Sequence, residues 1–392
     1  MGRRDQGEEH QAGLSTTDAD MNPRWPLDDL FVIDSTVHGY NVQPANHVDG
    51  RFRKTVAEQL SETLYVGHSK LIPDGDPKWA LTRQEFLHAA DPNLLGHALF
   101  AESQTDMCIY HGTPLYGIYK DGGSPLSVGK AMRERWPDRV ALYGPVSPWQ
   151  ADALDEIDRL VEEDKVVGLK FYPMDLIDGE IKSYRLDDPE IAYPLIERAR
   201  QRGLKIIATH KAIPQGQVPS EPFAPHDVAG AATAFPDMTF EIVHGGIAYL
   251  EETAWQMQRF PNVVVNLEGS SAYLLQRSPR RFAELIGSLL MWGGEDRIVW
   301  ATGCVAHHPR PFIELFWRFE IPQDMVDGYG YPPLTEQAKR KILGLNHARL
   351  LGWDVATLRE RHAQDEFGKL AEMAGPWDHA RRPSFPSTEV PA

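Results

Sequence analysis

The chain contains only two cysteines, Cys108 and Cys304, among its 392 residues. Two cysteines do not make a disulfide framework, and they favour a reducing, cytoplasmic setting. The sequence also lacks any apolar run of about 18 residues, which argues against a membrane-spanning helix. Neither a G-x-S-x-G motif nor a Gly-rich phosphate loop after the first predicted strand is present, and the GSS at Gly269–Ser271 is a weak substitute for a nucleophile turn.

Positive charge is also scarce. The sequence has 40 Lys and Arg against 56 Asp and Glu, a formal net charge of -16. A nucleic-acid partner would need a basic footprint, so this balance argues against one, although it says little about a pocket. We therefore expect a small-molecule substrate, no membrane or nucleic-acid partner, and a homo-oligomer.

The chain does have eight apolar runs that each end in polar residues suited to chemistry. They span residues 30–34, 106–111, 139–144, 166–173, 204–210, 238–246, 262–269 and 297–304. Continuous apolar strands that alternate with amphipathic helices indicate a parallel sheet covered by helices. Eight such units predict an α/β fold, a (β/α)8 TIM barrel with its active site at the strand ends. An open doubly wound sheet is the main rival, and the missing phosphate loop disfavours it.

Turns and helices between the runs agree with this count. Trp-Pro-Asp, Phe-Pro-Asp, Phe-Pro-Asn and Gly-Gly-Glu-Asp precede the strands at 139, 238, 262 and 297. Proline removes the preceding residue from the α region, and Asp, Asn and Gly favour turns. Amphipathic helices are predicted at residues 151–163, 189–201, 249–259 and 281–292.

One large domain accounts for most of the length. We predict a flexible N-terminal segment at 1–28, the barrel at 29–354 and a C-terminal helix and tail at 355–392. A long insertion after the first strand, residues 39–103, is expected to form a lid or a wall of the site, because long loops in compact domains are usually functional or disordered. Both ends, including the Pro-rich and charged stretch at 375–392, are expected to fray.

Three histidines and a carboxylate stand at or just past predicted strand ends: His38, His210, His244 and Glu268. Barrel closure would bring them to one mouth, and residues two apart on a strand share a face. This ligand set suits a divalent metal, with zinc expected and iron, manganese or cobalt as alternatives. Each residue also has a structural interpretation, as a hydrogen-bonded core histidine or a simple acceptor.

Other strand-end residues remain open. Lys170 would pair with Glu268 or a substrate carboxylate, or be carbamylated and bridge two metals. Cys304 would be a buried apolar residue or a thiolate ligand, and the buried interpretation leads. His307 and His308 would lie behind the ligands or on the surface.

Several segments resemble a known family. The sequence GLKFYP at 168–173, the HGG at 244–246, the His210 context and the helix KILGLNHARLLGW at 341–353 are similar to the amidohydrolase-related family of metal-dependent hydrolases and decarboxylases. The resemblance covers residues 31–353 and implies a metal-dependent enzyme on a TIM barrel.

Two departures from the family pattern concern the metal. Members carry D-x-H-x-H on strand one, whereas this chain has Asp34, Thr36 and His38, so the first His is replaced. Members carry Gly-Ser-Asp on strand eight, whereas residues 301–304 read Ala-Thr-Gly-Cys without an Asp. Three interpretations follow: a rearranged site of His38, His210, His244 and Glu268, which we favour; a two-metal site completed by carbamylated Lys170; or a metal-free barrel.

Three functions follow from these residues together with the activities that the resemblance implies. The leading hypothesis is a hydrolase of a small amide, thiocarbamate, lactone or related C–N or C–O bond, with Glu268, His244 and Lys170 as catalytic residues and Glu268 replacing the missing Asp. A nonoxidative aromatic-acid decarboxylase is the second hypothesis, with a cation from Lys170, Lys211 or Arg281. A non-catalytic binding barrel is the third. Expected substrate contacts are Tyr110, Tyr172, Lys211 and Tyr273, with Phe171 as a further aromatic residue near the mouth.

Overall fold

A computed structural model describes residues 29–214, 216 and 218–386 of the chain. The chain divides into two units, residues 1–30 and 31–392, and all helices and strands discussed below lie in the second. The N-terminal segment that we expected to be flexible, residues 1–28, lies outside the described residues, as do residues 387–392. No described helix is both long and apolar enough to cross a membrane.

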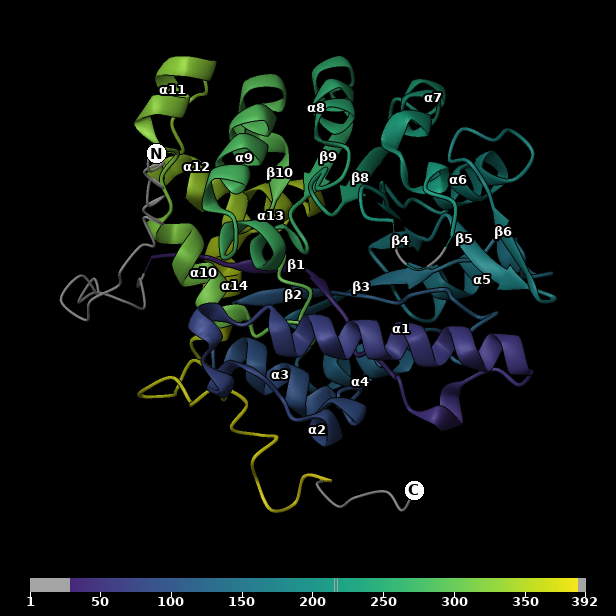
Figure 1. Cartoon of the computed structure of the whole chain (residues 1–392), viewed down its shortest axis with the longest axis horizontal. Coiled ribbons are helices and arrows are strands. Elements are labelled where there is room, and N and C mark those ends of the chain that lie inside the picture. Colours follow the sequence, from purple (N-terminus) through teal and green to yellow (C-terminus); the bar gives the residue numbers. More distant parts are fainter. Residues whose placement is uncertain (1–28, 215, 217, 387–392) are drawn as a thin grey trace, which may run out of the picture. The chain divides into compact units, whose positions relative to one another are not determined.

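Eight parallel strands form one sheet in the order β1-β2-β3-β4-β7-β8-β9-β10 (Figure 1). They are β1 (Ile33–Val37), β2 (Met107–His111), β3 (Val140–Pro145), β4 (Gly168–Phe171), β7 (Ile206–His210), β8 (Thr239–Val243), β9 (Val263–Asn266) and β10 (Ile298–Val299). The two edges meet: Ser35 N–H donates to Trp300 O at 2.9 Å, and Val37 forms a parallel bridge with Cys304. The predicted TIM barrel is confirmed, with one strand for each apolar run.

The barrel is a packed core because its strands are buried on both faces. All residues of β1, β2 and β9 are buried, as expected when side chains alternate between the barrel interior and the surrounding helices. Each fully buried Ile, Val or Phe contributes about 1.5–3 kcal/mol. One core cluster contains Phe31, Ile33, Met107, Ile109, Ala141, Tyr143, Ile206, Ala208, Val243 and Ala348.

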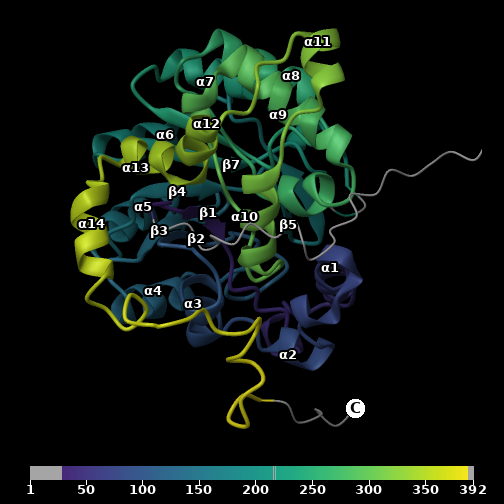
Figure 2. The same cartoon turned by 90° about the vertical axis from the view of Figure 1, so that its left-hand side faces the viewer.

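The barrel strands alternate with helices, as the views in Figures 1 and 2 show. The four helices predicted between strands are present as α5 (Ala153–Glu162), α6 (Ala192–Gln201), α8 (Leu250–Arg259) and α9 (Pro279–Gly293). The other helices of this part are α4 (Leu126–Arg135), α7 (Val228–Ala234), α10 (Pro309–Arg318), α11 (Gln323–Tyr329), α12 (Glu336–Arg340), α13 (Asn346–Leu351) and α14 (Val355–His362). Residues 341–353 resemble the family's late helix. They begin with a π-helical turn at Lys341–Leu345 and continue as α13, which is capped by Gly352 with a φ of 67°.

The insertion after β1 is largely helical. It contains α1 (Arg51–Lys70), α2 (Arg83–Leu87) and α3 (Pro92–Phe100). A capping box starts α2: Thr82 Oγ1 accepts from the Glu85 N–H and the Glu85 carboxylate accepts from the Thr82 N–H. One side of α1 lines a cavity at the strand ends, so the insertion contributes a wall to the site.

A short hairpin follows β4. Its strands β5 (Met174–Ile177) and β6 (Glu180–Ser183) are antiparallel and form a separate sheet. Asp178 and Gly179 connect them with φ values of 53° and 83°. Positive φ at both residues of a two-residue turn matches the right-handed twist of the strands, which is why Asp-Gly occurs there. The sequence analysis missed this hairpin.

The C-terminal stretch corrects another expectation. We predicted that residues from 375 onward fray, yet Trp377 is fully buried and Phe385 is 5% exposed. The backbone N–H of Trp377 donates to the Glu102 carboxylate at 2.7 Å, and its indole N–H donates to Trp79 O at 2.9 Å. The proline and charge content suggested a free tail, but one large aromatic residue anchors the stretch to the insertion.

Trp377→Ala should therefore destabilise the protein by about 3–5 kcal/mol, because the substitution removes a fully buried aromatic side chain and leaves a cavity. The measurement is the midpoint of thermal unfolding of the full chain. Trp292→Ala is the matched control, since Trp292 is 41% exposed, and it should lower the midpoint much less. Equal midpoints for the two variants would contradict the anchoring role.

Candidate active site

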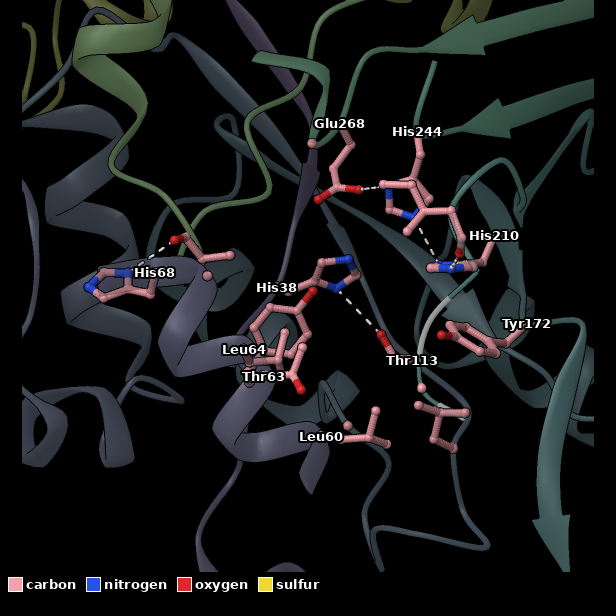
Figure 3. A pocket seen from close by; sticks show the side chains of 18 of the residues that line it. His38, Leu60, Thr63, Leu64, His68, Thr113, Tyr172, His210, His244 and Glu268 are labelled. Carbon is pink, nitrogen blue, oxygen red and sulfur yellow. Dashed lines mark hydrogen bonds and ion pairs between the residues drawn. The ribbon is translucent and has the colours of Figure 1, made fainter. Parts of the chain in front are cut away.

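A cavity of about 420 Å³ lies at the C-terminal ends of the barrel strands, where TIM barrels place their active sites (Figure 3). The barrel contributes polar groups and α1 contributes a mostly apolar wall. The polar and aromatic lining residues are His38, Tyr40, Thr113, Lys170, Tyr172, His210, His244, Glu268, Tyr273 and His307. From α1 come Leu60, Thr63, Leu64, Gly67 and His68.

The strand ends position the four predicted metal ligands. His210 is the last residue of β7, and His38, His244 and Glu268 follow β1, β8 and β9 within two residues. His244 has a φ of 81°, and Gly245 and Gly246 continue in the left-handed region. A non-glycine residue in this region is uncommon and occurs mostly where surrounding structure enforces it. The chain therefore turns sharply at His244, beside the cavity.

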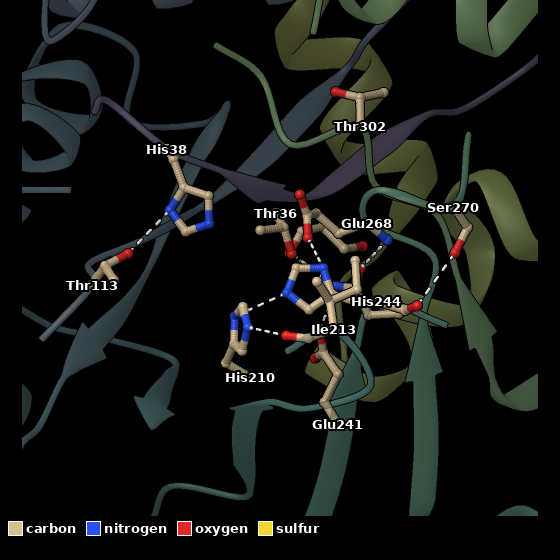
Figure 4. A network of polar contacts seen from close by, with 12 residues as sticks. Thr36, His38, Thr113, His210, Ile213, Glu241, His244, Glu268, Ser270 and Thr302 are labelled. Carbon is tan, nitrogen blue, oxygen red and sulfur yellow. Dashed lines mark hydrogen bonds and ion pairs between the residues drawn. The ribbon is translucent and has the colours of Figure 1, made fainter. Parts of the chain in front are cut away.

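A chain of polar contacts runs through Glu268, His244 and His210 (Figure 4). Oε2 of Glu268 contacts Nδ1 of His244 as an ion pair. Nε2 of His244 lies 2.9 Å from Nδ1 of His210, and Nε2 of His210 lies 3.1 Å from the Ile213 carbonyl oxygen. Each histidine thus has one nitrogen turned outward to an oxygen and one turned inward to the other histidine.

The directions of these hydrogen bonds fix where the protons are. A carbonyl oxygen only accepts, so Nε2 of His210 carries a hydrogen. Burial, with His244 and Lys170 nearby, holds the pKa of His210 well below its usual value, so His210 is neutral and its Nδ1 accepts from His244. Burial alone would raise the pKa of Glu268, but the His244 and Lys170 charges outweigh it and lower the pKa to about 2. Nε2 of His244 therefore carries the hydrogen that it donates to His210, and its Nδ1 faces the Glu268 carboxylate.

Glu268 occupies space next to strand eight. A Cβ added to Gly303 would overlap Oε1 of Glu268, and Gly303 has a φ of 71°. The carboxylate therefore lies where a side chain at position 303 would start. We expected Glu268 to replace the missing strand-eight Asp because β9 borders β10, and this packing gives that expectation a physical basis.

His38 lies across the cavity from the other two histidines, as Figure 3 shows. Its Nδ1 is 3.0 Å from the His111 carbonyl oxygen and 3.4 Å from Thr113 Oγ1. Burial and the nearby Lys170 charge lower its pKa to about 3, so the ring is neutral near pH 7. Because Nδ1 donates to a carbonyl, Nε2 is left with a free lone pair.

Lys170 supplies the cavity's ammonium group. It is 1% exposed, and burial lowers its pKa to about 8 although Glu268 and Glu241 act in the opposite direction. In the described part of the chain no side chain makes an ion pair or hydrogen bond with its Nζ at contact distance, whereas Glu268 already pairs with His244. The cavity therefore has an unmatched positive charge.

The metal prediction meets a mixed result. Within residues 29–214, 216 and 218–386, no three His, Cys, Asp or Glu side chains are grouped closely enough to hold an ion, so His38, His210 and His244 do not share one point as we expected. Their chemistry nevertheless fits a metal. All three histidines have the outer nitrogen bonded to an oxygen, the arrangement that orients metal-ligating histidines.

The comparison with protein families bears on this site. The family model described as "Amidohydrolase" matches residues 123–353 of the chain, which is more than half of it. The chain belongs to the amidohydrolase family. The resemblance noted in the sequence is thereby confirmed.

Solved structures show the same fold as this amidohydrolase. An uncharacterised TIM-barrel protein from Bordetella bronchiseptica has a TM-score of 0.55 at 15% sequence identity, over 82% of this chain and 99% of its own. A 2,6-dihydroxybenzoate decarboxylase from Rhizobium has a TM-score of 0.52 at 15% identity, also over 82% and 99%. A search of curated protein sequences found no match.

Two predicted substrate contacts of the amidohydrolase do not line the cavity. Tyr110 is fully buried, and its hydroxyl donates to the Pro125 carbonyl oxygen at 2.8 Å. Lys211 pairs with Asp227 at 2.7 Å. Tyr110 precedes His111 at the end of β2, and Lys211 follows His210 at the end of β7. Side chains of successive strand residues point to opposite faces. Their sequence positions lie near the mouth, but this alternation turns both side chains away from the cavity.

The remaining candidates divide in the same way. Tyr172, Tyr273 and His307 line the cavity. Among those that do not, Cys304 is buried, His308 pairs with Glu102, and Arg281 is exposed on α9. Phe171 is fully buried and likewise does not line the cavity.

The sequence analysis missed Tyr40, Thr113 and His68. Tyr40 stacks on His38, with ring centroids 4.9 Å apart. Thr113 follows β2 by two residues, so the strand-end rule that found the histidines would have found it too. His68 lies on α1, and no periodicity in the insertion predicts which side of that helix faces the barrel.

The lost family histidine has a structural replacement. Thr36 Oγ1 accepts from Asn266 Nδ2 at 2.9 Å, and Asn266 also donates to Glu241 at 2.6 Å. Burial raises the pKa of Glu241 to about 7. Thr36 therefore belongs to a buried polar layer rather than to a ligand set.

Gly303→Ala should displace the Glu268 carboxylate, because the new methyl group would occupy its place. Gly352→Ala is the matched control: Gly352 is left-handed with a similar φ of 67° and has nothing within 4 Å of an added Cβ. Both should lose about 1–2 kcal/mol from left-handed strain. Only Gly303→Ala should shift the ¹⁵N resonances of the His244 ring, and unchanged resonances would contradict the assigned packing.

Proposed function

We propose that this amidohydrolase is a metal-assisted, nonoxidative decarboxylase of a small aromatic carboxylic acid. The observation that carries the proposal is that one cavity holds an unmatched ammonium, Lys170, and His244, whose Nε2 donates a hydrogen bond and whose Nδ1 faces Glu268. The first group suits a carboxylate and the second suits protonation of carbon. Decarboxylation thus ranks above hydrolysis, which was the leading hypothesis from the sequence.

Charge selects the substrate class. Lys170 is nearly fully buried, and the neighbouring Glu268 is already occupied by His244. An ammonium in a low-dielectric cavity is stabilised by an anionic partner, and a hydrogen bond to a charged group contributes about 1.5–3 kcal/mol. A substrate carboxylate would supply this partner. A neutral amide or lactone would leave the charge unmatched.

His244 would deliver the proton. During decarboxylation the carbon–carbon bond to the carboxylate breaks, CO2 leaves, and the electron pair of that bond forms a new bond to hydrogen. His244 donates this hydrogen from Nε2, while Glu268 holds Nδ1–H and keeps the ring oriented. The neutral imidazole is then reprotonated from water, so no oxidant or reductant is consumed. A well-placed general acid contributes about 100- to 10,000-fold in rate.

Aromatic rings support a planar substrate body. The Tyr172 ring centroid lies 4.3 Å from that of His210, and Tyr40 stacks on His38. Tyr273 lines the same cavity and is 43% exposed. Aromatic pairs prefer offset or edge-to-face contacts, which flanking rings of this kind can offer to an arene.

A divalent metal would be held by His38 Nε2, His210 Nδ1 and Glu268. His210 Nδ1 would then give up its hydrogen bond from His244, whose Nε2–H would be left for proton transfer. Two histidines and a carboxylate are a known ligand set, and zinc is expected, with iron, manganese or cobalt as alternatives. When bound, the ion would polarise a substrate oxygen and neutralise negative charge. Binding requires side-chain movement, because these groups are not at ligand spacing here.

Hydrolysis of a small C–N or C–O bond is the second candidate. The same two histidines and carboxylate would suit metal-activated water, and the family includes hydrolases. It needs a base at the start of the reaction, whereas Nε2 of His244 carries a hydrogen in the arrangement described above. We therefore rank it below decarboxylation.

Product analysis tests the proposal. The full chain, reconstituted with Zn²⁺ or Mn²⁺, is incubated in D2O with 2,6-dihydroxybenzoate and other hydroxybenzoates. We expect CO2 and an arene with one deuterium at the carbon that carried the carboxylate. The opposite result would be turnover of amides or lactones, with ¹⁸O from water in the product, and no turnover of the acids. That result would contradict decarboxylation and favour the hydrolase.

The affinity for an aromatic carboxylate should depend on the protonation of Lys170. Its pKa of about 8 means that the ammonium is present below pH 8, so binding of 2-hydroxybenzoate should be constant there and weaken as the pH rises above 8. Lys170→Met should weaken binding about 10- to 100-fold and remove this pH dependence. Lys339→Met, which removes a mostly buried lysine that does not line the cavity, should do neither. Calorimetric titration from pH 6 to 10 measures both effects.

Glu268→Gln should reduce turnover by about 100-fold or more, because it removes the carboxylate that pairs with Nδ1 of His244 and orients its ring. If Glu268 is also a ligand, metal occupancy measured by elemental analysis should fall together with the rate. Full occupancy with a reduced rate would limit Glu268 to orienting His244. An unchanged rate at full occupancy would contradict both roles.

A further inference from the structure

A second cavity of about 470 Å³ lies between α1 and the β5–β6 hairpin. Its lining is mostly apolar. Phe52, Val56 and Leu60 come from α1; Met174, Leu176 and Ile181 come from the hairpin; and Leu115 and Ile118 come from the segment after β2. We call this cavity the side chamber.

The mouth of the side chamber exposes large apolar side chains. Phe52 is 55% exposed and Ile181 is 43% exposed, whereas Leu176, Ile118 and Met174 deeper in are 1%, 2% and 7% exposed. Scattered exposed apolar residues need no explanation, but two that flank an apolar cavity indicate a binding site. The chamber is thus shaped for an apolar ligand that enters past Phe52 and Ile181.

Charge is almost absent from its walls. Glu62 is the ionisable carboxylate among the described lining residues, and it is already held by Arg83 through two hydrogen bonds of 2.6 and 2.9 Å. No unmatched charge faces the chamber among these residues. A hydrocarbon chain therefore suits it better than a polar or ionic group.

The side chamber adjoins the catalytic cavity. The two share the lining residues Leu60, Thr63, Leu115, Tyr172 and Gly216. Tyr172 faces both, and its ring also lies against His210. Figure 3 shows Leu60 and Thr63 on the α1 side and Tyr172 on the barrel side of the catalytic cavity. The two cavities thus meet at these residues, and Lys170 lines the catalytic one.

We propose that the side chamber binds the apolar tail of the substrate, so that the substrate is an aromatic acid with an alkyl side chain. The inference rests on the proposed function for the acid end of the molecule. Lys170 would hold the carboxylate, the rings around the histidines would hold the arene, and the alkyl chain would lie between α1 and the hairpin. Burial of each methylene should tighten binding about fourfold until the chamber is filled.

A homologous series tests the chamber without depending on catalysis. The probes are 4-alkyl-2-hydroxybenzoates from methyl to hexyl, and the measurement is the dissociation constant for the full chain by calorimetry. We expect affinity to rise about fourfold per methylene along the series. Equal affinity of the methyl and hexyl compounds would overturn the inference.

Val56→Trp should abolish the increase, because Val56 is half-buried on the chamber side of α1 and an indole there would fill the space. Thr55→Trp is the matched control, since Thr55 is exposed on the same helix and lines neither cavity. Ile181→Glu is a second variant on an exposed hairpin position, and it should weaken the hexyl compound while leaving the methyl compound unchanged. A chain-length dependence that survives both chamber variants would place the tail elsewhere and overturn the inference.

The outcomes also separate the two proposals. A steep chain-length dependence without release of CO2 would support the side chamber and contradict decarboxylation. Release of CO2 from short-chain acids without any chain-length dependence would support the decarboxylase and contradict the side chamber.

Discussion

The contact between Glu268 and His244 is the constraint on which the rest of the site depends. It keeps a carboxylate ionised in a buried place, because burial alone would raise its pKa and the contact with His244 lowers it. It orients His244, and through it His210. It also requires glycine at position 303, since any larger residue would collide with the carboxylate. Glycine at position 303 and the place of the Glu268 carboxylate are therefore two parts of one arrangement.

Most of the barrel could be predicted from the sequence, because its physical causes are local. Eight apolar runs became eight strands, and the four helices predicted between them are present. The β5–β6 hairpin was not predicted, although Asp178-Gly179 is a strong turn signal, because its strands have only four residues each and β5 directly follows the apolar run that ends at Pro173. The burial of Trp377 was not predictable from local pattern, since it depends on Glu102 and Trp79, hundreds of residues earlier in the chain.

The candidate site was predictable to the extent that strand ends and side-chain alternation decide it. His38, His210, His244, Glu268 and Lys170 all line one cavity. Tyr110 and Lys211 were placed there by proximity in sequence, and alternation turns both away. The hydrogen-bond directions that make His244 a proton donor were beyond sequence reasoning, because they depend on the Ile213 carbonyl oxygen and on which ring nitrogen meets it.

In many enzymes the same residues must both perform the reaction and select the substrate. The position of the β5–β6 hairpin allows these two tasks to be carried by different elements. The groups proposed for chemistry stand on barrel strands, where every change disturbs a packed interior. The hairpin is an appendage with its own two-residue turn, and it forms no hydrogen-bonded pairing with the barrel sheet in the described part of the chain. Its second strand, β6, is exposed along its whole length, so the side chains there can vary with little effect on the barrel. Such a layout lets a lineage change which molecules it accepts while its reaction stays the same.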